Sequence, residues 1–398
     1  MEEYEDEMNG KWNRVSKLKS IGQLVRSFLI EEFSPFYFIS IMGMGISLNL
    51  LYSFDHNWLQ YCSFIMFAFT CIGFIVILSS FLISIYVNPT NLKQYHTNPK
   101  IAPFMGCLPM AYMTLVNFIW FLTEPTSVKV IFALWIVAVI LSLYSSCIIF
   151  YFTFMVKLKY NKLQFKQLNL TLMFPAVAIV VCASQGNYLV EDLPANFQLF
   201  TFFTSFSLLS IGLCMAFTLI IINFARIFIY KLPETKLIFT SFLPVGFLGQ
   251  AGCCTMLIGK NMKYLLKHHN FTNLVHKEIL GEVILMIMGG GCLFLISFGY
   301  FMTFMAVASV LSKCKPFNVK HHHPELTKNG YLTWFRGFWA LTFPLGTMSL
   351  AQYELSNSFN LSFFKIMSTV YATACIICTL ACMFGVLYRS LTLIYNAN

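Results

Sequence analysis

Charge is the scarcest property of this sequence. Asp, Glu, Lys and Arg make up only 11% of the 398 residues, whereas 58% are hydrophobic and 17% are aromatic. A typical soluble domain has about 25% charged residues, so this composition excludes a soluble enzyme or binding module. It predicts a polytopic membrane protein that faces the lipid bilayer over much of its surface.

Acidic residues are rarer still. The chain has 16 Asp and Glu against 26 Lys and Arg, a formal net charge of +10. Cytoplasmic loops of membrane proteins carry such an excess, so we do not interpret it as nucleic-acid binding. Residues 1–6 are acidic and the first long apolar run begins near Pro35, so we expect no cleavable signal peptide.

Motifs for catalysis and cofactor binding are also lacking. The sequence has no nucleotide-binding loop, no membrane-zinc motif and no Ser/His/Asp set in register. His321, His322 and His323 are consecutive, and adjacent histidines alone do not form a metal cage. Nearly all of the 13 cysteines lie in apolar runs, which favours buried free thiols. We therefore expect no enzyme activity, no cofactor and no metal site.

Ten apolar runs have about the 20 residues needed to cross a bilayer. They are Pro35 to Phe54, Tyr61 to Tyr86, Phe104 to Thr123, Val128 to Phe154, Leu168 to Gly186, Gln198 to Phe228, Lys236 to Gly259, Glu278 to Leu311, Thr333 to Tyr353 and Phe364 to Tyr388. The predicted fold is therefore an all-α polytopic membrane protein with a ten-helix transport domain over 35–388.

The two ends of the chain are predicted to be cytosolic. Residues 1–34 form an acidic tail and an amphipathic helix, which lies on the membrane face or packs in the cytosol. Residues 389–398 form a short tail. Lysine and arginine concentrate in the loops on this side, whereas the outer loops hold mainly Lys129 and a cluster from Lys260 to Lys277. This asymmetry predicts an N-in, C-in topology.

Two N-glycosylation sequons lie on the predicted outer side of the membrane. Asn270-Phe271-Thr272 and Asn360-Leu361-Ser362 both fall in external loops. Asn270 and Asn360 are therefore candidate N-glycosylation sites.

Prolines mark an internal repeat. Pro109, Pro175, Pro244 and Pro344 lie within the third, fifth, seventh and ninth runs, Gly43 takes the equivalent place in the first, and no even-numbered run contains a proline. A proline inside a helix kinks it. We therefore predict five two-helix hairpins, whose kinked odd helices form an inner ring around a central pore while the even helices face lipid.

The repeat predicts which side chains meet at the pore. The residue before each kink is large and apolar, which predicts a constriction that closes the pore by excluding water. These residues are Met42, Leu108, Phe174, Leu243 and Phe343. The aromatic members, Phe174 and Phe343, are the candidate gate. Helix packing alone is the alternative explanation for the prolines.

Polar residues flank the predicted constriction. Each odd run carries an amide beyond its kink, and these side chains either contact the anion or lie at the interface. They are Asn49, Asn117, Gln185, Gln250 and Gln352. Arg336 and Lys236 open two odd runs at the inner mouth, where positive charge concentrates anions, although ordinary positive-inside placement explains them too. Glu354, near the end of the ninth run, is a candidate for proton coupling or an interfacial carboxylate.

Three blocks of sequence resemble a known family. They are Glu32 to Phe36 followed by Met42 to Phe54, then Leu243 to Gly252, then Gly337 to Leu350. Through them the chain is similar to the tellurite-resistance/dicarboxylate transporter family, which includes the slow anion channels of plants, and within it to the fungal sulfite efflux pumps. The likeness covers essentially the whole transmembrane region.

This resemblance implies ten helices around a central pore, often in a homotrimer, with a ninth-helix phenylalanine that closes the path. Phe343 matches that position. It also implies a plasma-membrane exporter of small anions, with sulfite as the expected substrate. A C4-dicarboxylate (malate) transporter and a nitrate or chloride channel of the same fold stay open. The repeat and the short loops argue against a membrane receptor.

Overall fold

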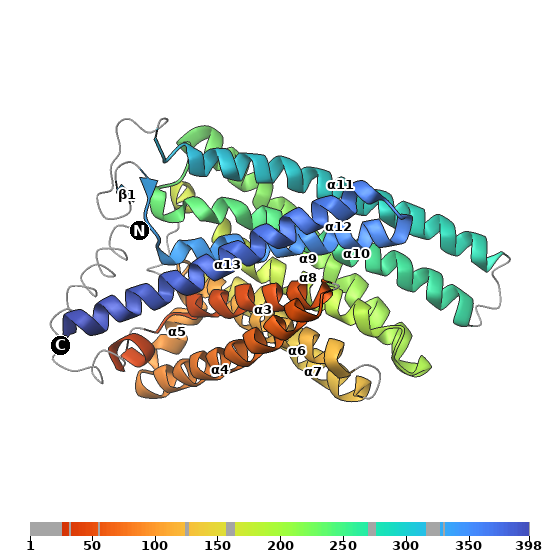
Figure 1. Ribbon diagram of the computed structural model, residues 1–398, viewed down its shortest axis with the longest axis horizontal. Coiled ribbons are helices and arrows are strands. Elements are labelled where there is room, and N and C mark those ends of the chain that lie inside the picture. Colours follow the sequence, from red (N-terminus) through yellow and green to blue (C-terminus); the bar gives the residue numbers. More distant parts are fainter. Residues whose placement is uncertain are drawn as a thin grey trace.

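The computed structural model describes residues 26–31, 33–54, 56–123, 127–156, 164–269, 276–315, 327–328 and 331–397. Almost all of this part of the chain is helical, and the long helices run side by side (Figure 1). The predicted acidic tail and most of the amphipathic segment lie outside the described residues. The described part of that segment is a single π-helical turn, η1 (Ser27–Glu31).

Ten long helices are arranged as five hairpins, each made of a helix and its successor in contact. The pairs are α3 (Phe38–Ser53) with α4 (Asn57–Val87), α6 (Cys107–Thr123) with α7 (Val128–Leu143), α8 (Phe174–Leu189) with α9 (Ala195–Tyr230), α10 (Leu243–His268) with α11 (Lys277–Leu311), and α12 (Thr342–Phe359) with α13 (Ser362–Ala397). Within the described residues, nine helical segments are long and apolar enough to cross a membrane. The remaining one, α12, is the most polar of the ten. The ten-span count and the orientation stay predictions.

The first helices of the five hairpins, which we call the ring helices, form a closed ring. In the order α3, α6, α8, α10 and α12 each packs against the next, and α12 packs back against α3. They run in one direction, because contacts between neighbouring ring helices advance along both chains together. The paired contacts are Gly246–Pro344 and Gly249–Met348, Gly43–Thr342 and Ile46–Gly346, Gly45–Thr114 and Asn49–Asn117, Gly106–Phe174 and Trp120–Tyr188, and Ser184–Gln250 and Asn187–Asn261. All five amino-terminal ends therefore lie at one end of the ring.

The second helices cover the ring from outside. We compare the most apolar stretch of each segment that could cross a membrane. In the second helices only 22–39% of this stretch is buried, whereas in the four ring helices among the nine segments 67–100% is buried. The second helices are α4, α7 with its extension, α9, α11 and α13. Their exposed residues are large and apolar, such as Phe69, Phe203 and Phe301. A band of this kind is suited to lipid contact. The predicted division into inner and outer helices is confirmed.

Every ring helix starts with a 3-10 segment. These segments are η2 (Pro35–Tyr37), η3 (Ala102–Gly106), η7 (Leu170–Met173), η8 (Thr235–Phe242) and η9 (Arg336–Leu341). Pro109, Pro175, Pro244 and Pro344 then fall in the first turn of the α-helix that follows, where a missing N–H costs no α-helical hydrogen bond. The prolines thus mark a change of helix type, whereas the sequence suggested kinks midway along continuous helices.

Gly43 has a different role from the prolines. α3 continues through it without a change of helix type. A Cβ added at Gly43 would lie 2.2 Å from Oγ1 of Thr342 and 3.1 Å from the indole of Trp339. Glycine is therefore required because α12 and its 3-10 segment approach α3 closely here.

Shorter elements connect the hairpins. α5 (Thr90–Thr97) lies between the first two, and π-helical turns η4 (Tyr144–Ile149) and η5 (Tyr151–Met155) extend α7. η6 (Phe165–Gln167) precedes the third hairpin. Before η9, β1 (Thr327–Lys328) pairs antiparallel with β2 (Tyr331–Leu332).

Candidate anion path

A small cavity lies where the ring helices change from 3-10 to α. All five ring helices or their 3-10 segments line it, and its walls are wholly apolar or backbone. Its volume is about 10 Å³, roughly the space of one water probe. The lining residues are Ile39, Met42, Met110, Phe174, Val177, Leu243, Gly246, Ala340, Phe343 and Pro344. The centre of the ring is therefore closed by side chains.

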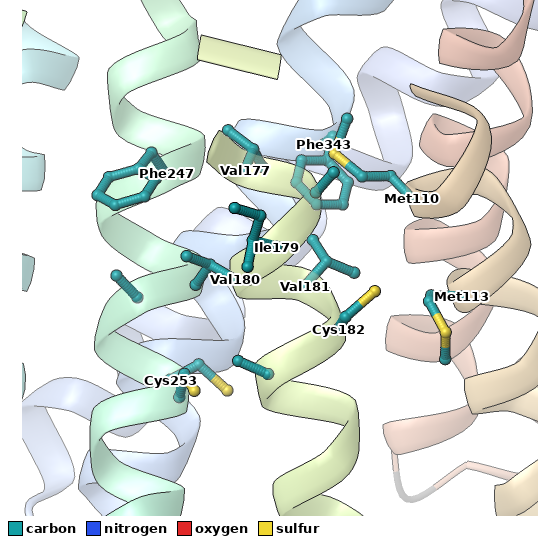
Figure 2. Close-up of a cluster of buried hydrophobic side chains, with 14 of the residues drawn as sticks. Met110, Met113, Val177, Ile179, Val180, Val181, Cys182, Phe247, Cys253 and Phe343 are labelled. Carbon is teal, nitrogen blue, oxygen red and sulfur yellow. The ribbon is translucent and has the colours of Figure 1, made fainter. Parts of the chain in front are cut away.

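Four of the five residues predicted for the constriction line this cavity. Met42, Phe174, Leu243 and Phe343 do so, but Leu108 does not. Met110 takes its place, because two residues along an α-helix rotate a side chain by about 200°. In Figure 2, Met110 of α6 and Phe343 of α12 point toward one another.

Both candidate gate residues are held by close packing. Phe174 is 2% exposed and its ring lies 5.4 Å from that of Phe104, centroid to centroid. A Cβ at Gly106 would lie 2.8 Å from the carbonyl carbon of Phe174, so this glycine allows η3 to approach the start of α8. Phe343 is 3% exposed. Moving either aromatic ring therefore requires the side chains around it to shift.

The five predicted amides do not form one ring. Asn49 donates to the carbonyl oxygens of Gly45 (2.6 Å) and Thr114 (3.0 Å), and Asn117 donates to Asn49 at 3.1 Å. This pair therefore joins α3 to α6. Gln352 accepts a hydrogen bond from Tyr300 of α11 at 3.1 Å, so it faces an outer helix.

The amides of the two remaining ring helices are also buried. Gln185 of α8 has no partner for its side-chain nitrogen in the described part of the chain. Next to it, Ser184 donates to the backbone carbonyl of Gln250 on α10 at 3.5 Å. The contact of these two amides with an anion stays a prediction.

The two predicted mouth cations lie at the amino-terminal ends of ring helices, as the sequence indicates. Arg336 donates to the hydroxyl of Tyr37 at 3.0 Å and its guanidinium stacks 5.2 Å from that ring. It thereby ties η9 to η2. Lys236 is half-buried in η8. Positive charge is thus present at this end, together with a clear structural role for Arg336.

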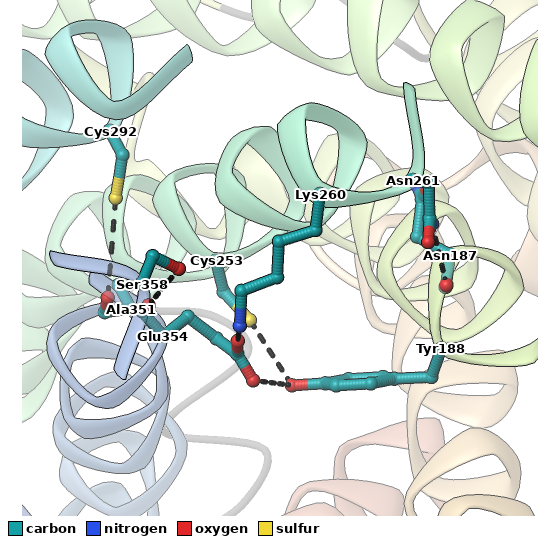
Figure 3. Close-up of polar contacts among 9 residues, drawn as sticks. All are labelled: Asn187, Tyr188, Cys253, Lys260, Asn261, Cys292, Ala351, Glu354 and Ser358. Carbon is teal, nitrogen blue, oxygen red and sulfur yellow. Dashed lines mark hydrogen bonds and ion pairs between the residues drawn. The ribbon is translucent and has the colours of Figure 1, made fainter. Parts of the chain in front are cut away.

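A polar cluster at the carboxyl-terminal end of the ring was not anticipated. Lys260 of α10 forms an ion pair with Glu354 of α12, and Tyr188 of α8 donates to the other carboxylate oxygen of Glu354 at 3.3 Å (Figure 3). The same hydroxyl lies 3.4 Å from Sγ of Cys253. Three ring helices therefore meet through charged and polar side chains.

The sequence predicts Lys260 in an external loop. In the structure α10 continues to His268, so Lys260 is helical. A sequence pattern indicates this longer helix, because Met262, Leu265 and Leu266 recur at helical spacing and no glycine or proline interrupts them.

Other sequence candidates lie apart from the ring. Asn360 is exposed and ends α12 with a φ of 52°, whereas Asn270 lies outside the described residues, as do His321, His322 and His323. Among the described residues no three His, Cys, Asp or Glu side chains are grouped as metal ligands would be.

Comparison with known proteins adds a further finding. Residues 32–387 match the family described as voltage-dependent anion channel (SLAC1). The chain is 40% identical to the sulfite efflux pump SSU1 of Candida albicans, over 97% of this chain and 80% of that protein. It is 29% identical to the sulfite efflux pump SSU1 of Saccharomyces cerevisiae, over 91% of this chain and 88% of that protein. The sulfite efflux pump SSU1 of Trichophyton rubrum is 26% identical, over 91% and 92%.

Proposed function

Because the chain belongs to the voltage-dependent anion channel family, we propose that it exports small anions, sulfite first among them, through the centre of its helix ring. The activity is transport, without a catalytic step. The names of its relatives favour sulfite over malate, nitrate or chloride. The proposed location is the plasma membrane.

One observation carries the proposed path. All five ring helices line the same closed, apolar cavity, as a shared gate requires. An apolar constriction blocks ions because it offers no replacement for their hydration. Displacement of the Phe343 ring, with Phe174 beside it, is the proposed opening step.

The two ends of the ring suit an outward anion flow. The amino-terminal ends carry Arg336 and Lys236, which raise the local anion concentration if this side is cytosolic. The membrane potential then drives each charge outward with about 2.3 kcal/mol per 100 mV. No other energy source is needed for net efflux.

Sulfite flux in proteoliposomes under an imposed voltage tests the proposal. We expect sulfite to move along the voltage gradient without a proton gradient, and to outcompete malate and nitrate. Phe343→Ala should raise the flux, because it removes the ring that fills the cavity. Flux of malate but not of sulfite would disprove sulfite as the substrate. The absence of any anion flux would disprove the proposed transport function.

Phe118→Ala is the matched control. Phe118 is fully buried on ring helix α6, but it packs against Phe67 of α4, 4.8 Å between ring centroids, and does not line the cavity. Each truncation costs about 3–5 kcal/mol of stability. Equal flux through both folded variants would remove Phe343 from the gate.

Assembly and modification are separate proposals. A homotrimer is proposed from the family resemblance, and mass measurement of the protein in lipid nanodiscs tests it. Glycosylation at Asn270 or Asn360 would appear as a loss of mass after enzymatic deglycosylation, abolished by Asn→Gln at the modified position.

A further inference from the structure

The Lys260–Glu354–Tyr188 cluster lies above the apolar cavity, toward the carboxyl-terminal end of the ring. Glu354 follows Phe343 by eleven residues, about 16 Å along α12 and about 20° around it. Tyr188 follows Phe174 by fourteen residues and Lys260 follows Gly246 by fourteen, each about 40° around its helix. Each residue thus shares a helix face with one that lines the cavity.

The contacts confirm that the cluster faces inward. α8 and α12 are the two ring neighbours of α10, so the hydrogen bond from Tyr188 to Glu354 passes across one face of α10. A different face of α10, about 100° around the helix from Lys260, packs on α11 through Gly259, which meets Met288. The bond therefore crosses the interior of the ring.

The cluster contains donors that suit an anion. The Lys260 ammonium and the Tyr188 hydroxyl both point at one carboxylate (Figure 3), and that carboxylate is itself a bound oxyanion. The side chain of Lys260 is 31% exposed while that of Glu354 is 9% exposed. The lysine is thus partly accessible to solvent, whereas the carboxylate is covered.

The Tyr188 ring is fixed in place from a fourth ring helix. Trp120 of α6 lies 5.5 Å from it, centroid to centroid, and the indole N–H of Trp120 donates to Asp192 at 3.2 Å. A rigid donor loses little freedom when it binds.

We propose that Lys260 and Tyr188 form a binding site for the exiting oxyanion, and that Glu354 is its built-in competitor. The site rests on the proposed function, since it takes the same substrate after the gate. An ion must be held strongly enough to enter and weakly enough to leave. An arriving anion must displace the carboxylate from Lys260, so Glu354 weakens binding and speeds release toward the carboxyl-terminal end.

Glu354→Gln is the central test. The amide keeps the size of the side chain and removes the competing charge, so the half-saturating sulfite concentration for flux should fall about tenfold, the scale of one charge-assisted hydrogen bond. Maximal flux should fall as well, because release is slower. Tyr188→Phe keeps the ring against Trp120 and should raise the half-saturating concentration instead.

Glu282→Gln is the control. Lys263 of α10 forms another ion pair, with Glu282 of α11, and its Nζ lies 2.6 Å from Oε1 of Glu282. Both side chains are about half exposed. Breaking it should leave the half-saturating concentration unchanged. If Glu354→Gln and Glu282→Gln give the same half-saturating concentration, the competitor is disproved.

A binding measurement separates this inference from the proposed function. Trp120 touches Tyr188, so sulfite titrated into detergent-solubilised protein should change tryptophan fluorescence, and Trp120→Phe should abolish the change. Binding without flux would overturn the transport function and keep the site. Flux with no sulfite-dependent fluorescence change, and with unaltered kinetics in Glu354→Gln, would overturn the site alone. The double variant Lys260→Met/Glu354→Gln leaves no unpaired buried charge and should bind more weakly than Glu354→Gln.

Discussion

Tyr188 on α8 donates a hydrogen bond to Glu354 on α12, although α10 lies between these helices in the ring. Polar contacts therefore cross the ring near its carboxyl-terminal end. The cavity near its amino-terminal end has only apolar side chains. The molecule thus separates an apolar barrier from a polar site along one axis.

The position of Met110 leads to a first prediction. Met110 lines the cavity and Leu108 does not, so Met110→Ala should increase anion leak through reconstituted protein, whereas Leu108→Ala should not. Each truncation costs about 2–5 kcal/mol if fully buried, so thermal unfolding serves as the control for stability. If only Leu108→Ala increased the leak, Leu108 and not Met110 would form the constriction, as the sequence predicts.

Asn49 has a structural role in this arrangement, which can be tested separately. Asn49→Ala removes its hydrogen bonds to Gly45 and Thr114 and leaves Asn117 without its acceptor. We expect a loss of about 1–3 kcal/mol in stability, seen as a lower melting temperature in detergent. The preference for sulfite over nitrate should stay the same. If the preference changed while the melting temperature did not, Asn49 would contact the anion and would not be structural alone.

The contact of α10 with α12 leads to a third prediction. A Cβ at Gly249 would lie 2.5 Å from the backbone nitrogen of Met348, so Gly249→Ala must push two helices apart. We expect destabilisation of roughly 1–3 kcal/mol, measured by thermal unfolding. Gly290→Ala is the matched control, because it lies on exposed α11 with nothing within 4 Å, and there alanine should stabilise by about 0.5–1 kcal/mol.

Arg336 carries a prediction on ionic strength. If its charge concentrates anions at the inner mouth, Arg336→Gln should reduce flux more at 0.01 M than at 0.15 M salt, since the screening length falls from about 30 Å to about 8 Å. Tyr37→Phe removes the hydroxyl that Arg336 binds and keeps the charge. It should show no such salt dependence. A flux loss equal at both salt concentrations would limit Arg336 to tying η9 to η2.

Much of the fold follows from the sequence because lipid imposes a simple rule. Apolar runs must span the bilayer as helices, so their pairing into hairpins and the inner position of the proline-containing members were predictable. The 3-10 segments before each proline were not. A proline is compatible both with a kink and with the first turn of a helix, and local sequence does not distinguish the two.

The site was predicted less completely, for geometric reasons. Choosing the residue before each proline assumes that every repeat has the same register, yet the cavity-lining residue of α6, Met110, follows its proline, whereas Phe343 of α12 precedes its own. Such shifts rotate side chains by about 100° per residue. The pairing of Lys260 with Glu354 joins residues 94 positions apart, and only the closed ring brings them together.

The glycine contacts between α10 and α12 limit how fast and how far the proposed gate can act. Because the two backbones touch at Gly246 and Gly249, α12 has no room to move toward α10 as a rigid body. The proposed opening step is then rotation of Phe343 about its own side-chain bonds, with small shifts of the side chains around it. Rotamer exchange is intrinsically faster than the microsecond-to-millisecond shift of a packed helix, so single-molecule current records should show brief flickers in place of long-lived open states.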